Sequence, residues 1–457
     1  MNKSTTRSTK QFTGCASLAA LGVKLRALKL FEPIEQRVQI AQKTIKDKPT
    51  DKLYDALISM LAGAHGLVEI NTRLRADAGL QRAFGRTRCT EQSVVQDTLN
   101  ACTAENVEQM EHALDAIYRQ HSQGYQHDYQ ASFQVLDVDM SGLPCGPTAA
   151  FATKGYFAKQ RNRRGRQLGR VLATTYQEVV VDRLFDGKTQ LTRALQPLVL
   201  AAEETLQLDE DKRRRTIMRL DAGGGSLDDV NWLLARGYLV HCKDYSGQQA
   251  KRLASSVVDW YVDPHLPERQ FGWVTAATDA YVRPVKRIAV RCRQQDGQWA
   301  YGVLISALSA QHVLLLTGQS LSLLADPAAV PLAYVSFYDQ RGGGVETSFK
   351  GDKQGLGIGK RSKKRFAAQQ MVMLLGSLAH NVVVWARHWL ASPTLHHYGT
   401  LRMVRDVFHI SGFLLTDACG QVAQIVLNQT APLASALVHP LRNLLACAHV
   451  AVNLGQT

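Results

Sequence analysis

The pattern of the chain changes from helical to strand-like near residue 131, and the order of elements after that point limits the fold more than any other feature. Three strand-length apolar segments come first, and the third ends at Asp186-Gly187, a dipeptide typical of hairpin turns. Helices and strands then alternate, as expected for an α/β layer with a mixed sheet. The predicted strands are 131–140, 169–176, 179–185, 216–221 and 238–243, and the predicted helices are 191–206 and 227–235.

The chain has 457 residues, enough for about three domains. Residues 1–128 have helical spacing of apolar positions, and 129–255 carry the first part of the α/β core. We expect 256–332 to be a β-rich insertion rather than a continuation of that sheet. The core then resumes with helices over 333–395, and 396–457 form a C-terminal region with a strand pair and a helix.

The charge balance indicates an anionic polymer as partner. There are 54 Lys and Arg against 39 Asp and Glu, a net charge of +15 although only 20% of residues are charged. An apolar fraction of 45% excludes wholesale disorder. The eight cysteines are scattered without a C-x-x-C pair, which indicates reduced thiols.

No apolar segment opens the chain, so we expect no signal peptide. The most apolar run, 371–386, is shorter than the ~20 residues that span a bilayer, and we expect it to be a buried helix. These features predict a soluble intracellular protein.

Three acidic residues stand in apolar or glycine-rich surroundings, where a carboxylate requires a positive partner. Asp139 interrupts an apolar strand, Asp221 ends another, and Glu346 follows Gly342–Gly344. Three converging carboxylates suit two Mg²⁺ ions, which prefer oxygen ligands and promote phosphodiester displacement. Asp137, two residues from Asp139 on the same strand face, is an alternative first ligand.

The surroundings of the third acid carry a motif. Tyr338 and Arg341 stand in a Y-x-x-R arrangement, and Glu346 is followed by six residues and then by Lys353. This segment resembles the Y-x-x-R…E-x6-K signature of bacterial cut-and-paste insertion-sequence transposases, which are DDE enzymes with a ribonuclease H-like core. Four residues separate Arg341 from Glu346, where three are usual in the family.

The resemblance continues upstream and covers residues 131–391. Val138-Asp139-Met140-Ser141 is similar to the family's first motif, and Arg219-Leu220-Asp221 is similar to the second. The fold implied is α/β, with a ribonuclease H-like mixed-sheet core interrupted by the β-rich insertion and flanked by helical regions. The N-terminal region would then serve DNA binding or dimerisation.

The resemblance implies a DNA transposase that cuts the ends of an insertion sequence and joins them to target DNA. Asp139, Asp221 and Glu346 would hold two Mg²⁺ ions, with Mn²⁺ as a substitute. Tyr338, Arg341 and Lys353 would contact DNA. The partners implied are double-stranded terminal repeats, target DNA and a second copy of the chain in a homodimeric synaptic complex, without a membrane or nucleotide cofactor. The location implied is the bacterial cytoplasm, at the nucleoid.

The same signature predicts local geometry. Glu346 and Lys353 are seven residues apart, which places them on one face of a regular helix. Gly342–Gly344 predict a break, after which Glu346 begins a new helix while Tyr338 and Arg341 remain on a separate turn.

Two basic segments flank the acids in sequence, and we expect them to bind DNA phosphates. Such segments are also common as solvated surfaces. For Trp273, in the β-rich block, the resemblance implies stacking on a flipped base, although a core tryptophan is the commoner case. The basic DNA-binding candidates are Arg161, Arg163, Arg164 and Arg166 in the first segment, and Lys360, Arg361, Lys363 and Lys364 in the second.

Two alternatives to a transposase remain. A metal-dependent nuclease of the same fold would share every residue named above but would not join strands. A domesticated DNA-binding protein would have kept the fold without catalysis, although all three acids are present.

Overall fold

The computed structural model describes residues 9–43, 46–157, 160 and 162–456, and the chain divides into two compact units. The sheet unit comprises Gln123–Gly142 and Lys154–Thr347, and the helical unit comprises Met1–Ser122, Leu143–Thr153 and Ser348–Thr457. Residues 333–395, expected to be a continuous part of the core, are therefore divided between the two units.

The first five long strands of the large sheet have ribonuclease H-like order. Strand β5 pairs antiparallel with β4, β4 neighbours β2, and β2 pairs in parallel with β6, which pairs in parallel with β7. Numbered along the chain, this order is 3-2-1-4-5, so the predicted fold class is confirmed. These five strands are β2 (Gln134–Pro144), β4 (Arg164–Ala173), β5 (Glu178–Asp186), β6 (Thr216–Leu220) and β7 (Leu239–Lys243), and the short β3 (Thr153–Lys154) neighbours β4.

The β-rich block continues this sheet instead of forming a separate insertion, so that expectation was wrong. Strand β11 pairs antiparallel with β7, and β10, β9 and β8 follow it outward. The short apolar runs predicted the strands, but hydrophobic pattern does not specify which strand is a neighbour. These strands are β8 (Tyr261–Val262), β9 (Arg269–Trp273), β10 (Lys286–Arg293) and β11 (Trp299–Ser306).

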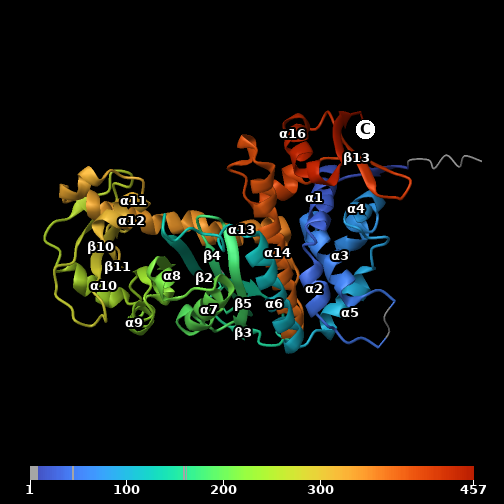
Figure 1. Cartoon of the computed structure of the whole chain (residues 1–457). Helices are drawn as coiled ribbons and strands as arrows, with labels where there is room; N and C mark the ends of the chain where they lie inside the picture. Colours follow the sequence, from blue (N-terminus) through green and yellow to red (C-terminus); the bar gives the residue numbers. More distant parts are fainter. Residues whose placement is uncertain (1–8, 44–45, 158–159, 161, 457) are drawn as a thin grey trace, which may run out of the picture. The chain divides into compact units, whose positions relative to one another are not determined.

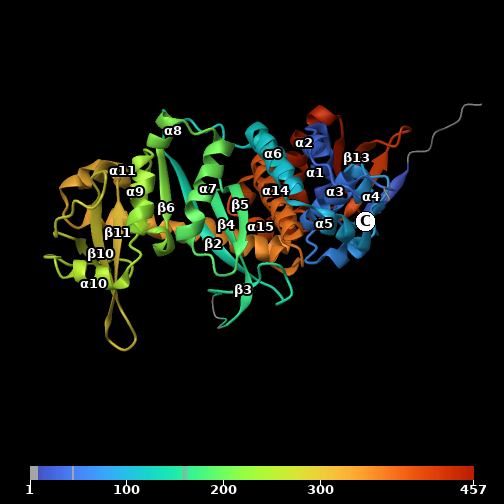
Figure 2. The ribbon, with the colours of Figure 1, turned by 90° about the horizontal axis from the view of Figure 1, so that it is seen from below.

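Helices cover the sheet within this unit. Helix α7 packs on β4 and β5 (Figure 2), α10 packs on β10 and β11, and α12 packs on β9–β11. Between α12 and the sheet lies an apolar core that includes Val135, Ile217, Leu239 and Phe337. The helices are α7 (Leu191–Leu206), α8 (Glu210–Arg214), α9 (Leu227–Ala235), α10 (Gly247–Ala254), α11 (Ala310–Leu316) and α12 (Ala329–Arg341).

The helical unit brings together segments from both ends of the chain. Helix α14, drawn in orange among the blue N-terminal helices of Figure 1, contacts α3, α5 and α6. It is long and apolar enough to cross a membrane, but 94% of its most apolar stretch is buried within the protein, as expected for a core helix. The helices are α1 (Ala16–Ala27), α2 (Glu32–Arg37), α3 (Pro49–Leu61), α4 (Ala78–Ala83), α5 (Gln92–Ala101), α6 (Ala104–His121), α14 (Phe366–Leu390), α15 (Thr400–Arg402) and α16 (Ala434–Leu445).

A second, four-stranded sheet in this unit has the order β1-β12-β13-β14. Its edge strand β1 (Lys10–Thr13) was missed because the sequence shows no strand-like alternation so near the N-terminus. The other strands are β12 (Gly412–Thr416), β13 (Val422–Asn428) and β14 (Ala451–Gly455).

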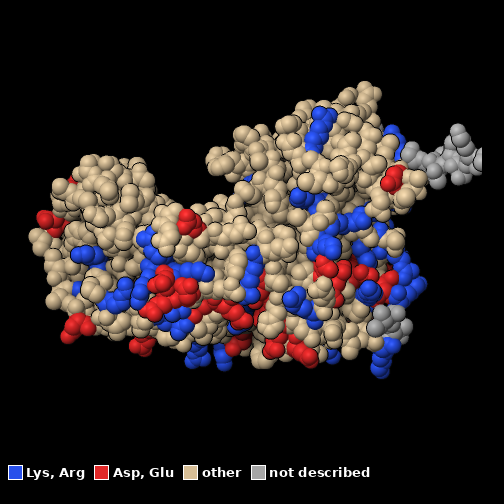
Figure 3. All heavy atoms as spheres, viewed as in Figure 1, with Lys and Arg blue, Asp and Glu red and all other residues tan. Residues whose placement is uncertain are grey.

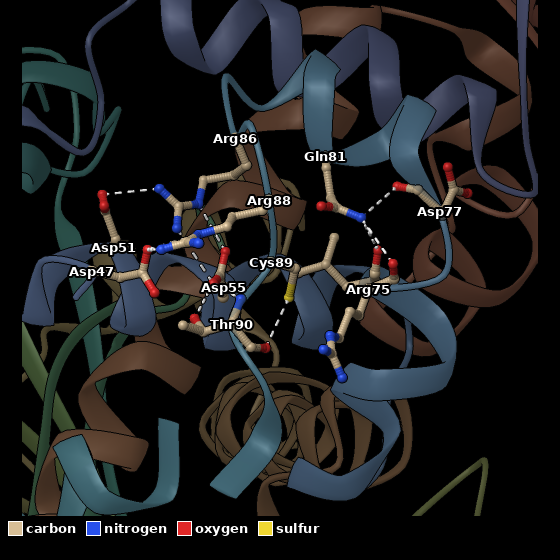
Figure 4. Close-up of polar contacts among 11 residues, drawn as sticks. Asp47, Asp51, Asp55, Arg75, Asp77, Gln81, Arg86, Arg88, Cys89 and Thr90 are labelled. Carbon is tan, nitrogen blue, oxygen red and sulfur yellow. Dashed lines mark hydrogen bonds and ion pairs between the residues drawn. The ribbon is translucent and has the colours of Figure 1, made fainter. Parts of the chain in front are cut away.

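Ion pairs join helix α3 to the loop after α4. Asp55, which is fully buried on α3, accepts from the Arg86 guanidinium at 2.8 Å and from the amide and hydroxyl of Thr90 (Figure 4). Arg86 also pairs with Asp51 at 3.0 Å. These contacts give Asp55 a counter-ion and hydrogen bonds that compensate its burial, so we assign this cluster a structural role.

Candidate active site

Parallel register aligns polar residues in rows across β2, β6 and β7. Asp137 lies opposite Arg219, and Arg219 lies opposite His241. Because side chains two residues apart share a face, Asp139 and Asp221 lie one step further along on the same face, just beyond the last paired residues of β2 and β6. The sheet itself therefore brings two of the three predicted acids together.

Asp137 is a structural partner of Arg219. The Nε and Nη2 atoms of Arg219 donate to the two Asp137 carboxylate oxygens at 2.6 and 2.9 Å, and Nη1 donates to the carbonyl of Phe337 on α12 at 2.7 Å. Both side chains are at most 1% exposed. With both oxygens engaged by a buried guanidinium, Asp137 is committed to the core, and Asp139 remains as the candidate ligand. The same contacts fix α12 on the sheet.

Arg341, the last residue of α12, brings Asp139 and Glu346 together. Its Nη2 lies 3.0 Å from Oδ2 of Asp139, and its Nη1 lies 3.2 Å from Oε1 of Glu346. Nη2 also lies 3.4 Å from the Val138 carbonyl. The Arg341 side chain is 4% exposed, whereas that of Glu346 is 58% exposed. The two carboxylates thus bind one guanidinium, Asp139 from the inner side and Glu346 from the solvent side.

The electrostatics of the cluster reflect its burial. Burial raises the pKa of Asp139 to about 6; Arg341 opposes this rise, and the charges of Asp221 and Glu346 add to it. Burial opposes the charge of Arg341, but Asp139 and Asp221 more than offset it and raise the Arg341 pKa. Asp221 therefore acts on the same cluster, while its Oδ1 accepts from the Gly223 amide at 2.8 Å.

A wide turn connects Arg341 to Glu346. Residues Gly342–Glu346 form a π-type turn, with a kink at Gly344, where φ is −92° and ψ is −108°. A side chain at Gly344 would lie 2.5 Å from Oδ2 of Asp137 and 3.1 Å from Cγ2 of Thr174, so the kink requires glycine. A π-type turn contains one residue more than an α-turn. The fourth spacer residue is accommodated in this way, and Arg341 still reaches Glu346.

The break at the glycines is as predicted, but Glu346 lies in the turn, one residue before α13 (Thr347–Gly351). A second π-type turn, Asp352–Leu356, contains the half-buried Lys353. Because neither turn has regular helical spacing, the expectation that Glu346 and Lys353 share one helix face was wrong. Lys353 belongs to the helical unit, and the other signature residues belong to the sheet unit.

Tyr338 is partly buried on α12, where its ring lies 6.1 Å from that of His241, and burial raises its pKa. Trp273 is also partly buried and packs edge-to-face on Tyr334 at 5.7 Å. Trp273 therefore packs on the core, and its role in base stacking stays a prediction.

The basic candidates separate by burial. Arg163 and Arg164 are exposed, whereas Arg166 is 1% exposed because it lies inside β4. Arg161 lies outside the described residues. On the face in Figure 3, basic and acidic side chains are intermixed rather than gathered into one basic field.

The second basic segment likewise contains both exposed and buried residues. Lys360 and Lys364 are exposed. Arg361 is buried and donates to the Ala64 carbonyl, and Lys363 is buried with its ammonium on Gln96. Neither Arg361 nor Lys363 lies at the surface, contrary to the expectation that both contact DNA. Helical packing buries them, which sequence charge does not reveal.

Lys243 was not selected from the sequence. It ends β7 and aligns with Asp221 when the register of Arg219 with His241 is continued by two residues. Its stem lies over Gly302, where an added Cβ would meet Lys243 Cε at 2.8 Å. Its place at the strand end was visible in the sequence, but its alignment with two acids depends on the strand order.

The donor set suits a hard divalent cation, because all three candidate ligands are carboxylates. In the arrangement observed, no three His, Cys, Asp or Glu side chains of the described ranges are grouped closely enough to hold a metal ion. Arg341 stands between two of the three acids, so bringing them onto one ion requires the guanidinium to move.

No protein-family model matches the chain, and no curated protein matches it. Among solved structures, it is similar to the piggyBac transposase in a synaptic complex with hairpin DNA, determined by cryo-electron microscopy. The alignment covers 95% of this chain and 84% of that chain, with 11% identity and a TM-score of 0.45. Because identity and TM-score are this low, the likeness does not extend to activity or partners.

Proposed function

We propose that this chain is a DDE transposase of the bacterial cut-and-paste type. The observation that carries the proposal is the pairing of Asp139 and Glu346 with Arg341, beside Asp221 at the end of the neighbouring strand of a ribonuclease H-like sheet. A nuclease of this fold acts on phosphodiesters, and the net charge of +15 suits a polyanionic substrate.

In this proposal Asp139, Asp221 and Glu346 hold Mg²⁺, or Mn²⁺ in its place. Two such ions supply activation of the attacking oxygen and stabilisation of the leaving oxygen. Arg341 and Lys243 bind DNA phosphates beside the acids, and Tyr338 on α12 contacts the same DNA strand. The exposed Arg163 and Arg164 bind the DNA duplex further away. A second copy of the chain would complete a synaptic complex on paired DNA ends.

The test is cleavage and joining of labelled duplexes that carry the inverted repeats flanking the gene. Asp139→Asn, Asp221→Asn and Glu346→Gln are each expected to lose Mg²⁺-dependent cleavage while duplex binding persists, because the carboxylates hold metal rather than DNA. Glu268→Gln, an exposed acid of the same unit, is the matched control and retains cleavage.

The outcomes separate the alternatives. Cleavage with joining of a free 3′-hydroxyl end to plasmid DNA supports the transposase. Cleavage without joining supports the nuclease. Binding without cleavage by the unaltered chain, in Mg²⁺ or Mn²⁺, refutes both and leaves a DNA-binding protein.

A further inference from the structure

We infer that Arg341 is a resident counter-ion of the carboxylate cluster, and that nucleic acid must draw its guanidinium away before divalent metal binds tightly. The inference rests on the proposed function, because it concerns the same acids. It adds that metal binding and DNA binding are coupled through one side chain.

The first argument is steric. Nη2 and Nη1 of Arg341 contact Asp139 and Glu346 at 3.0 and 3.2 Å. Two carboxylates bound to one Mg²⁺ each place an oxygen at ~2.0–2.1 Å from it, which leaves no room for a guanidinium between them. Metal and guanidinium therefore compete for the space between these two carboxylates.

The second argument concerns what keeps Arg341 in place. Its side chain is 4% exposed, and its Nε has no hydrogen-bond partner among the residues that the structure describes. A buried guanidinium with an unsatisfied donor is held mainly by its carboxylates. A DNA phosphate offers a comparable charged acceptor, because arginine binds phosphate and carboxylate with similar two-pronged geometry.

The third argument is that the turn after Arg341 allows movement. Gly342 and Gly343 have open space where a side chain would stand, and Glu346 is largely exposed. Arg219 fixes the preceding turn of α12 through the Phe337 carbonyl. The helix is therefore anchored one turn before Arg341, and room to move is confined to Gly342 and Gly343, because Gly344 and Val345 are buried.

The test is Mn²⁺ affinity of the full chain, measured from free Mn²⁺ by electron paramagnetic resonance, with and without a 30-base-pair duplex at low salt. The Asp221→Asn variant with the same duplex measures the background, which is the Mn²⁺ bound by the duplex and by the chain outside the proposed site. The unaltered chain is expected to bind Mn²⁺ weakly alone and at least about fivefold more tightly with duplex, the lower end of typical coupling between two sites.

Arg341→Gln is expected to bind Mn²⁺ at least about fivefold more tightly than the unaltered chain without DNA, and the duplex should add little. Arg341→Lys keeps the charge but not the two-pronged contact, so its Mn²⁺ affinity without DNA is expected to lie between those of the unaltered chain and Arg341→Gln. Arg269→Gln is the matched control, because Arg269 pairs with Asp263 and Asp339 rather than with the cluster, and its Mn²⁺ affinity should not change.

Equal Mn²⁺ affinity of the unaltered chain and both Arg341 variants, abolished by Asp139→Asn, would overturn this inference and leave the proposed metal site standing. The proposed metal site itself would be overturned if neither Asp139→Asn nor Asp221→Asn weakened Mn²⁺ binding, whether introduced into the unaltered chain or into the Arg341 variants. An equal gain from duplex in the unaltered chain and Arg341→Gln would show that the coupling does not pass through Arg341.

Discussion

Asp137→Asn is expected to destabilise the sheet unit strongly, although it changes one carboxylate to an amide of the same shape. In the native chain both carboxylate oxygens bind the Arg219 guanidinium, at 2.6 and 2.9 Å, and both side chains are at most 1% exposed. The variant leaves a buried cation without a counter-charge. Breaking one partner of such a pair costs about 3–5 kcal/mol.

In a unit of this size that loss lowers the melting temperature by roughly 10 °C. The double variant Asp137→Asn with Arg219→Met removes both charges, so it is expected to recover part of the loss. The coupling free energy between the two sites should then be about 2 kcal/mol or more. Urea unfolding of the four proteins, followed by circular dichroism, measures this cycle.

The same urea unfolding measurement, applied to a variant of Asp139, distinguishes the two neighbouring acids. Asp139→Asn is not expected to destabilise the metal-free chain at neutral pH, because burial already disfavours the charged form of Asp139. Single variants at 137 and 219 that each cost less than about 1 kcal/mol, or that add without coupling, would refute the assignment of this pair to the core.

Three further predictions follow from the same unit. Gly344→Ala should cost at least about 2 kcal/mol of unfolding free energy, since its Cβ would lie 2.5 Å from a carboxylate oxygen, whereas Gly343→Ala, which faces open space, should change stability by less than about 1 kcal/mol in thermal unfolding. In EDTA, which removes divalent metal, the free energy of unfolding of the native chain should fall by about 3 kcal/mol as pH rises from about 4 to 7, because Asp139 loses its proton. The folded-state pKa of Asp139, about 6, lies above the ordinary 3.8, so between these values the folded chain binds a proton that the unfolded chain has released. The Asp139→Asn variant should lack this part of the pH dependence. Equal pH profiles of stability for the native chain and the variant would contradict the prediction. Replacing Arg163 and Arg164 with Gln should reduce the salt dependence of duplex binding by about one unit of log–log slope for each lost phosphate contact, and an unchanged slope would mean that they are only solvated surface.

Much of the fold was readable in the sequence because the period of apolar residues reports which face of an element is buried. The strands that carry Asp139 and Asp221, and the break at the three glycines, all followed from local pattern and composition. The pairing of β11 with β7 did not, because neighbouring strands separated by a long loop leave no local trace.

The sequence alone nominated the three acids, since a carboxylate among apolar residues is costly unless it has a partner, and the resemblance to the family signature nominated Tyr338 and Arg341. Only the tertiary structure shows that Asp137 is the partner of Arg219, because the register of β2 with β6 places the two residues opposite each other. Burial likewise separated exposed from buried members of the basic segments, which share the same charge. Sequence specifies which groups need a partner, whereas strand order and packing determine which partner each group meets.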